Sequence, residues 1–341
     1  MEKRVKTFPE NSVIEQDAIL EDESIDEYEQ YIAQFDPLNT DRKARRRKPG
    51  PGRHTPRKPD DQLIQEIAQA DVLEGGFNIT YTPGRYEEGW LLDSLRTFFD
   101  QALITDVLRS VKGGKEASVY CCVADPAIGV DLLAAKVYRP RMFRTLRNDS
   151  LYRQGRDLLT AGGRAVKKTD HRIMRAIGKR TAFGVHVMHY SWLMHEFTAL
   201  QMLHEAGGAV PRPIAAGENA ILMGYCGDAL MAAPTLNEID LEPDEAEPLF
   251  REVVRNIELM VDHDIIHGDL SAYNMLYWDG ELVIIDFPQV THCTTNESAY
   301  EILERDITRV CEYFAGQGVE TDGAGLLERL WARYAVEEVA V

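Results

Sequence analysis

The sequence predicts an α+β fold of two lobes, in which a β-rich lobe precedes a shortened, mainly helical lobe. From Ile104 the chain alternates short apolar segments with glycine, a pattern typical of strands joined by tight turns. Farther along, EAEPLFREVVRNIELMVDHDI has the apolar spacing of a long amphipathic helix with acidic residues near its start. The almost wholly apolar segment ELVIIDF then has the character of a buried strand. This order of segments places the sheet first and the helices second.

A charged tail and a helical segment are expected ahead of the sheet. Residues 1–40 hold three basic and eleven acidic side chains, whereas residues 42–58 hold nine basic side chains and no acidic ones. Such like-charge blocks, mixed with proline and glycine, predict a disordered tail over residues 1–60. Residues 61–103 contain two amphipathic stretches, LIQEIAQADVL and EEGWLLDSLRTFFDQAL, and are expected to be helical.

The β-rich lobe is expected over residues 104–224 and the helical lobe over residues 225–341. Strands are predicted at ITDVLRSV, SVYCCVA, VDLLAAKVY and NAILMGYC. Residues 139–190 lack a sustained apolar period and are rich in arginine, lysine and glycine, which predicts a long, flexible basic insertion with some helix within the first lobe. A helix is predicted to follow it, from Trp192 to Glu205.

Bulk composition excludes several classes of protein. No apolar run approaches the length of a membrane span, and the N-terminus lacks the apolar stretch of a secretory signal, so we expect a cytoplasmic protein. Five cysteines without C-x-x-C spacing favour reduced thiols over a disulfide framework or a zinc site. The net charge of −18 argues against an obligate nucleic-acid binder, although the basic blocks make its distribution uneven.

The strongest chemical signal is the segment IHGDLSAYN, which a short turn separates from VIID. Phosphoryl transfer needs a group that accepts or orients the proton of the attacking hydroxyl, and oxygen ligands that hold Mg²⁺ against the phosphates. In the spacing H-x-D-x-x-x-x-N, Asp269 fits the first role, and Asn274 with Asp286 fits the second as metal ligands. We therefore predict a protein-kinase-like fold that uses ATP and Mg²⁺, with Mn²⁺ as a substitute.

A glycine turn between the first two predicted strands is expected to cover the nucleotide phosphates, although a plain hairpin turn would explain it when taken alone. Lys136 follows inside an apolar strand, where an unpaired ammonium would be costly, so it needs an anionic partner. Glu196 can supply one and position Lys136 against the phosphates, and we assign both to catalysis. The residues assigned to the turn are Gly114, Lys115, Glu116, Ala117, Ser118 and Val119.

The nucleotide base is expected to lie at the end of the strand NAILMGYC. In this assignment Met223 lines the back of the pocket, and Tyr225 and Cys226 lie nearest the base. An ordinary core strand that runs into a turn explains the same three residues equally well.

Together these segments resemble the RIO family of atypical serine/threonine protein kinases, in its bacterial type. The resemblance rests on GKEASVY, AAKVY, HGDLSAYNMLY and IIDFPQ and covers residues 104–314. It implies a non-specific serine/threonine protein kinase that uses ATP and phosphorylates a protein hydroxyl, its own included. The family's loop reads close to STGKEANVY, from which Lys112, Gly113 and Ser118 depart.

Three features separate the sequence from ordinary protein kinases. Asp286, Phe287 and Pro288 stand where Asp-Phe-Gly is usual, so Pro288 replaces the glycine. The fixed φ of proline argues against a flip of this segment. Ser271 replaces a lysine two residues after the catalytic aspartate. No A-P-E motif follows, and the 55 residues after Asp286 are too few for a full peptide-binding lobe. Autophosphorylation or an ATPase-driven switch is therefore as consistent with the sequence as phosphorylation of many peptides.

Two alternatives stay open. H-G-D-x-x-x-x-N and I-D-F also occur in small-molecule phosphotransferases that act on aminoglycosides or choline-like alcohols. A nucleotide-dependent ribosome or RNA assembly factor would use the basic segments 42–58 and 139–180 to contact phosphates. The simpler explanation of those segments is a solvated basic surface. No aromatic residues, which would stack on bases, interleave with the charges from Arg42 to Lys58.

Overall fold

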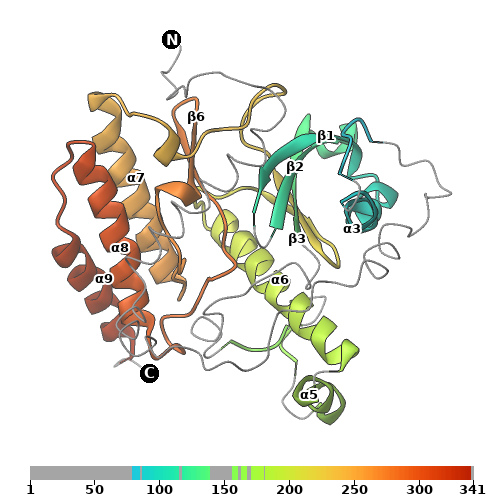
Figure 1. Cartoon of the computed structure of the whole chain (residues 1–341). Helices are drawn as coiled ribbons and strands as arrows, with labels where there is room; N and C mark the ends of the chain where they lie inside the picture. The colour runs from blue at the N-terminus through green and yellow to red at the C-terminus, as the bar shows by residue number, and fades with distance from the viewer. Residues whose placement is uncertain are drawn as a thin grey trace, which may run out of the picture.

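The computed structural model describes residues 79–84, 87–114, 117–138, 156–159, 163–166, 170–179 and 181–338, which form two lobes (Figure 1). The predicted tail over residues 1–60 and the first predicted helix between residues 61 and 76 lie outside these residues, as do residues 139–155 and three shorter parts of the predicted insertion. Lys115 and Glu116 of the predicted phosphate turn lie outside them too.

The first lobe is built on an antiparallel sheet of five strands in the order β1-β2-β3-β5-β4. Each of the four predicted strands is present. Apolar residues of these strands form a buried face of the sheet. This face packs on the helix that precedes the sheet in the sequence. The strands are β1 (Ile104–Gly113), β2 (Ala117–Ala124), β3 (Leu132–Tyr138), β4 (Pro213–Ala216) and β5 (Ala220–Gly224), with the short 3₁₀ turn η2 (Pro126–Ile128) between β2 and β3.

Helix α3 (Glu88–Asp100) covers one face of this sheet, as its amphipathic sequence predicted (Figure 1). Leu91, Leu95 and Phe98 lie on its buried face, and each is fully buried. They share one apolar cluster with Tyr120 of β2 and with Leu133 of β3. The helix is therefore an integral part of the first lobe, and the lobe's core depends on it.

Leu95→Ala is expected to lower the free energy of unfolding by about 3 kcal/mol, because it removes a fully buried side chain and leaves a cavity. Leu92→Ala on the same helix is the matched control, since Leu92 is only half-buried. Urea unfolding followed by circular dichroism measures both. Equal effects of the two substitutions would mean that α3 does not pack on the sheet in this orientation.

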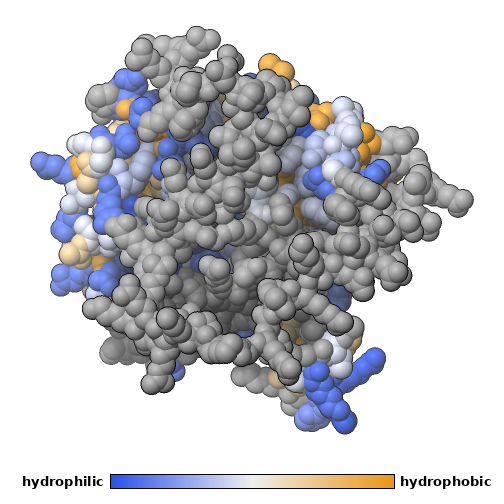
Figure 2. Space-filling model, viewed as in Figure 1, coloured by the Kyte–Doolittle hydropathy of each residue, from blue (hydrophilic) through white to orange (hydrophobic). Residues whose placement is uncertain are grey.

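A long helix, α6 (Ala182–Glu205), precedes β4 in the chain and shares an apolar cluster with residues of the second lobe. It begins ten residues earlier than the sequence predicted. The prediction of a start at Trp192 was wrong because the extra turns carry apolar residues without a clear period. Thr181 caps the helix, and its hydroxyl accepts a hydrogen bond from the Gly184 N–H at 3.2 Å. A short helix, α5 (His171–Gly178), packs against α6 and projects from its lower end in Figure 1. Hydrophilic residues gather over α5 at the lower right of Figure 2.

The second lobe contains three helices and one hairpin, and its long first helix matches the predicted amphipathic segment. Asp279 and Gly280 both have positive φ, at 50° and 89°, which is the geometry of a two-residue hairpin turn. The elements are η4 (Leu236–Glu238), α7 (Pro243–Asp262), η5 (Ala272–Asn274), β6 (Met275–Trp278), β7 (Glu281–Ile284), α8 (Ala299–Gly316) and α9 (Gly323–Glu338). Within the described ranges, none of the helices combines the length and apolar character that crossing a bilayer needs.

Candidate active site

Lys136 lies at the centre of the site, on β3, with only 8% of its surface exposed. Its Nζ is 2.6 Å from Glu196 Oε1, so the ion pair expected from the sequence is present. The same Nζ also contacts Asp286 Oδ1, which brings the predicted metal ligand into the pair. Burial alone would lower the pKa of Lys136, but the negative charges of Asp286 and Glu196 outweigh it and raise that pKa. The ammonium is therefore held charged between the two carboxylates.

Glu196 bonds to two other parts of the fold through three hydrogen bonds. It lies on α6, is 1% exposed, and accepts from Lys136 through Oε1. The hydroxyl of Tyr138 donates to Oε2, and the backbone N–H of Phe287 donates to Oε1 at 3.3 Å. Glu196 thereby fixes β3 and the segment after β7 relative to α6.

The loop from His267 to Asn274, which we call the catalytic loop after its predicted base, brings Asp269 and Asn274 together. Asn274 Nδ2 donates to the Asp269 carbonyl oxygen at 2.9 Å and lies 3.4 Å from Asp269 Oδ2. His267 braces the loop, because its Nδ1 accepts from the Asp269 N–H at 3.2 Å while Nε2 lies 3.1 Å from the Ile285 carbonyl oxygen. The Ile285 N–H donates to the Asn274 carbonyl oxygen at 3.0 Å. The loop is thus bonded directly to the residue that precedes Asp286.

Asp286 lies two residues beyond the end of β7, not at the end of the strand as predicted. Its φ is 71°, in the left-handed region, which aspartate and asparagine tolerate better than most residues. Its side chain is 40% exposed, in contrast to the buried Glu196. Burial would raise the pKa of Asp286, but the nearby Lys136 charge lowers it below the usual value. Asp286 therefore presents an ionised, accessible carboxylate beside Lys136.

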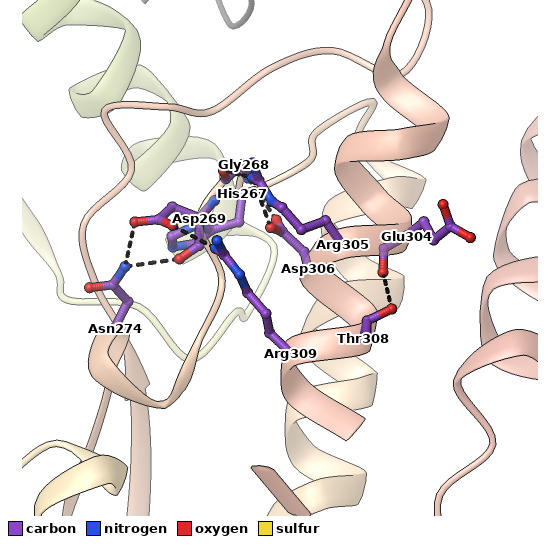
Figure 3. Close-up of polar contacts among 9 residues, drawn as sticks. All are labelled: His267, Gly268, Asp269, Asn274, Glu304, Arg305, Asp306, Thr308 and Arg309. Atoms are coloured by element: carbon purple, nitrogen blue, oxygen red, sulfur yellow. Dashed lines mark hydrogen bonds and ion pairs between the residues drawn. The ribbon is translucent and has the colours of Figure 1, made fainter. Parts of the chain in front are cut away.

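Helix α8 lies beside the catalytic loop and supports it with three buried charged residues that the sequence analysis did not single out (Figure 3). Asp306 Oδ2 accepts from the Gly268 N–H at 2.8 Å, and Arg305 donates to the Gly268 carbonyl oxygen. Arg309 Nη1 is 2.7 Å from Asp269 Oδ1. Gly268 has a φ of 84°, and a Cβ there would lie 2.4 Å from the Gln289 carbonyl oxygen, so only glycine fits this position.

The predicted phosphate turn joins β1 to β2 at the edge of the site. Gly114 lies in the turn, and a Cβ on it would come within 2.8 Å of the Ala117 carbonyl oxygen, which explains the glycine. Ala117 and Val119 are half-buried, whereas Ser118 is 5% exposed within β2. The Ser118 side chain is therefore buried in the first lobe.

The segment predicted to contact the nucleotide base, which we call the hinge, lies at the end of β5 and just beyond it. Met223 is 8% exposed and pairs with Ala134 of β3, while Tyr225 and Cys226 are partly exposed beyond the strand. Arg109 of β1 crosses to this segment, and its Nη2 donates to the Tyr225 hydroxyl at 2.6 Å. Burial raises the pKa of the Cys226 thiol to about 11, so this sulfur stays protonated at neutral pH.

The segment after Asp286 is held at its far end by a pair between His292 and Asp264, whose Nδ1 and Oδ2 are 3.3 Å apart. The hydrogen bond to Asp264 outweighs burial and raises the pKa of His292 above its usual 6.5. The stability that this pair adds is therefore fully present below about pH 6.5 and is lost as pH rises through the folded-state pKa.

The melting temperature is expected to fall more between pH 6 and pH 8 in the wild type than in Asp264→Asn, by about 2 °C, since both side chains are partly exposed and screened. Asparagine keeps one oxygen, which can accept the bond from the Thr294 N–H, and it loses the negative charge together with the second oxygen, which accepts from the Thr294 hydroxyl. Calorimetry at both pH values measures the difference. Parallel curves for the two proteins would contradict the assignment.

Comparison with known proteins places the chain in a family. Residues 160–324 match the RIO domain. The chain is 32% identical over 223 residues to the RIO-type serine/threonine-protein kinase Rio1 of Haloferax volcanii, covering 64% of this chain and 66% of that relative. It is 34% identical over 131 residues to the protein of the same name from Thermoplasma acidophilum, covering 38% of this chain and 67% of the relative.

Serine/threonine-protein kinase RIO1 of Chaetomium thermophilum is 32% identical over 231 residues, which is 64% of this chain and 41% of that relative. The chain thus spans about two thirds or less of these curated relatives. The crystal structure of the Rio2 kinase-ADP/Mg²⁺-phosphoaspartate complex from Chaetomium thermophilum is similar with a TM-score of 0.50 and 19% identity, over 79% of this chain and 74% of that one. That likeness confirms the two-lobed, α+β kinase fold, and the sequence matches show that the chain belongs to the family of RIO-type serine/threonine-protein kinases.

Proposed function

We propose that this chain transfers the γ-phosphate of ATP to a serine or threonine hydroxyl of a protein, its own chain included. The observation that carries the proposal is the position of Lys136, which is buried between Glu196 and Asp286. A charged ammonium in that place can bind phosphate oxygens once a nucleotide enters the cleft. The catalytic loop with Asp269 is bonded to the same segment as Asp286, so base, cation and metal ligand share one rigid frame.

The residues present fit Mg²⁺. Asn274 Nδ2 donates to Asp269, so the Asn274 Oδ1 points away from that bond and can serve as a metal ligand. Asp286 adds a carboxylate that is ionised and 40% exposed. Amide and carboxylate oxygens are the ligands that Mg²⁺ prefers, alongside phosphate oxygens and water. When bound, the ion neutralises charge on the phosphates, and Mn²⁺, which takes similar oxygen ligands, would substitute for it.

The chain's own residues then have separate tasks. Lys136 holds the phosphates, and the turn at Gly114 covers them with backbone N–H groups. Asp269 orients the acceptor hydroxyl and receives its proton as the oxygen bonds to the γ-phosphorus. The bond from that phosphorus to the bridging oxygen breaks, and its electron pair leaves with ADP. The base of the nucleotide would lie against the hinge at Met223, Tyr225 and Cys226.

Incubation of the purified full chain with γ-labelled ATP and Mg²⁺ tests this proposal, with label on protein and free phosphate followed together. A kinase labels itself or an added protein, and the label resists hydroxylamine because phosphoserine and phosphothreonine are stable to it. Label that hydroxylamine removes would instead indicate an acyl phosphate, the class to which the phosphoaspartate of the solved Rio2 kinase complex belongs. Phosphate release without protein label would favour an ATPase switch. Label on a small amino-sugar or choline-like alcohol would favour the small-molecule alternative.

A nucleic-acid partner is the second proposal, and the observation that favours it is helix α5. Arg172, Arg175 and Lys179 are exposed on or next to this helix, within the described part of the basic segment 139–180. Clustered cations of this kind bind phosphate backbones with strong salt dependence. Charge reversal of these three residues, and separately deletion of residues 1–60, should each weaken binding of a labelled RNA at low salt. Unchanged affinity for the RNA in both variants would mean that neither basic segment binds RNA, and the second proposal would fail.

A further inference from the structure

The catalytic carboxylate has a fixed cationic partner on α8. Arg309 is fully buried, at 0% exposure, and its Nη1 is 2.7 Å from Asp269 Oδ1. Figure 3 shows the two side chains pointing toward one another, with Arg309 extending from the helix beside the loop. A fully buried guanidinium carries a large desolvation cost, which its partner must offset. A contact of this kind on the proposed base therefore calls for an explanation.

The backbone of the catalytic loop is held without Arg309. Asp306 accepts from the Gly268 N–H and Arg305 donates to the Gly268 carbonyl oxygen, so both backbone groups before Asp269 are bonded to α8. Arg309 lies one turn farther along the helix and reaches the carboxylate itself. Its effect is thus expected on the side chain of Asp269 rather than on the path of the chain.

The two oxygens of Asp269 have different surroundings. Oδ1 is bonded to Arg309, whereas Oδ2 lies 3.4 Å from Asn274 Nδ2. Because Asn274 is the proposed metal ligand, Oδ2 is on the side where the phosphates and the acceptor hydroxyl would meet. Without Arg309 the carboxylate could rotate about its side-chain bonds and exchange the two oxygens.

We propose that Arg309 is a positioning residue for phosphoryl transfer, which holds Asp269 through Oδ1 so that Oδ2 faces the acceptor hydroxyl. This inference rests on the proposed kinase function and adds a residue to it. In this role Arg309 acts through its contact with Asp269. An orienting role of this kind changes the rate of the chemical step and leaves nucleotide affinity unchanged.

Arg309→Met is expected to lower kcat about a hundredfold, while KM for ATP stays within about twofold of the wild type, since a misplaced catalytic group costs rate rather than binding. Arg309→Lys should recover about tenfold of the loss, because it keeps the charge without the planar fork. Thr308→Ala and Val310→Ala are the controls on the same helix. Thr308 bonds only within α8, to the Glu304 carbonyl oxygen, and the fully buried Val310 tests whether loss of core packing alone lowers the rate.

A double-mutant cycle separates positioning from general support. In an Asp269→Asn background, Arg309→Met should cost less than about twofold in kcat, because its route of action is already gone. The double variant also removes both charges of the pair, which helps it fold if Arg309→Met alone does not. A hundredfold loss in that background as well, or a wild-type rate in Arg309→Met, overturns the inference while the kinase proposal stands. A wild type that neither labels protein nor releases phosphate overturns both.

Discussion

Asp269→Asn is expected to lower kcat for phosphoryl transfer by about a thousandfold, with KM for ATP nearly unchanged. The amide cannot accept the hydroxyl proton, and a general base contributes roughly 10²- to 10⁴-fold. Asparagine keeps an oxygen that can accept the bond from Arg309, so the loop should stay in place. Single-turnover transfer from γ-labelled ATP gives the rate of the chemical step. A separate nucleotide-binding assay gives the affinity for ATP.

The choice of asparagine over alanine follows from the contact with Arg309. Asp269→Ala would take the carboxylate away from a fully buried guanidinium, which costs on the order of 3 kcal/mol of stability. An activity loss in that variant would mix chemistry with unfolding. Comparing the melting temperatures of Asp269→Asn and Asp269→Ala separates the two effects. Wild-type turnover in a folded Asp269→Asn variant would contradict the assignment of Asp269 as the catalytic base.

Those parts of the site that lie on short motifs could be predicted from the sequence. Asp269 and Asn274 lie on one loop, so local spacing fixes their proximity before any long-range packing is known. The pairing of Lys136 with Glu196 followed from a different argument, the cost of an isolated ammonium inside an apolar strand. The structure gives that pair at 2.6 Å and adds Asp286 to it, which spacing alone did not indicate.

The support from α8 could not be predicted in the same way, because it depends on which helix face meets the loop. A signal was nevertheless present in the sequence. Arg305, Asp306 and Arg309 share a face with the apolar Ile302, at the helical spacing of a buried stripe. Charged side chains on a buried stripe need partners, which marks them as candidates for a site. The early start of α6 was missed for the opposite reason, since its first turns show no amphipathic period and only the Thr181 cap marks them.

Asp286→Asn should cost about as much activity as the change at Asp269, but by a different route. Replacing the carboxylate removes the charged oxygen ligand proposed for Mg²⁺, and we expect transfer to fall about a thousandfold. Asparagine is the right replacement because Asp286 has a φ of 71°, which alanine would adopt only with strain. Lys136 keeps Glu196 as a partner at 2.6 Å, so the fold should survive the change.

The metal dependence of nucleotide binding distinguishes this route from loss of a base. In the wild type and in Asp269→Asn, added Mg²⁺ should tighten binding of a non-hydrolysable ATP analogue, whereas in Asp286→Asn it should have little effect. Asp279→Asn is the matched control, since it makes the same chemical change at another left-handed aspartate, in the hairpin turn with a φ of 50°. If Mg²⁺ tightens nucleotide binding equally in Asp286→Asn and Asp279→Asn, Asp286 is not the metal ligand. Its contact with Lys136 would then be its whole contribution, and the activity loss would follow the displacement of that ammonium.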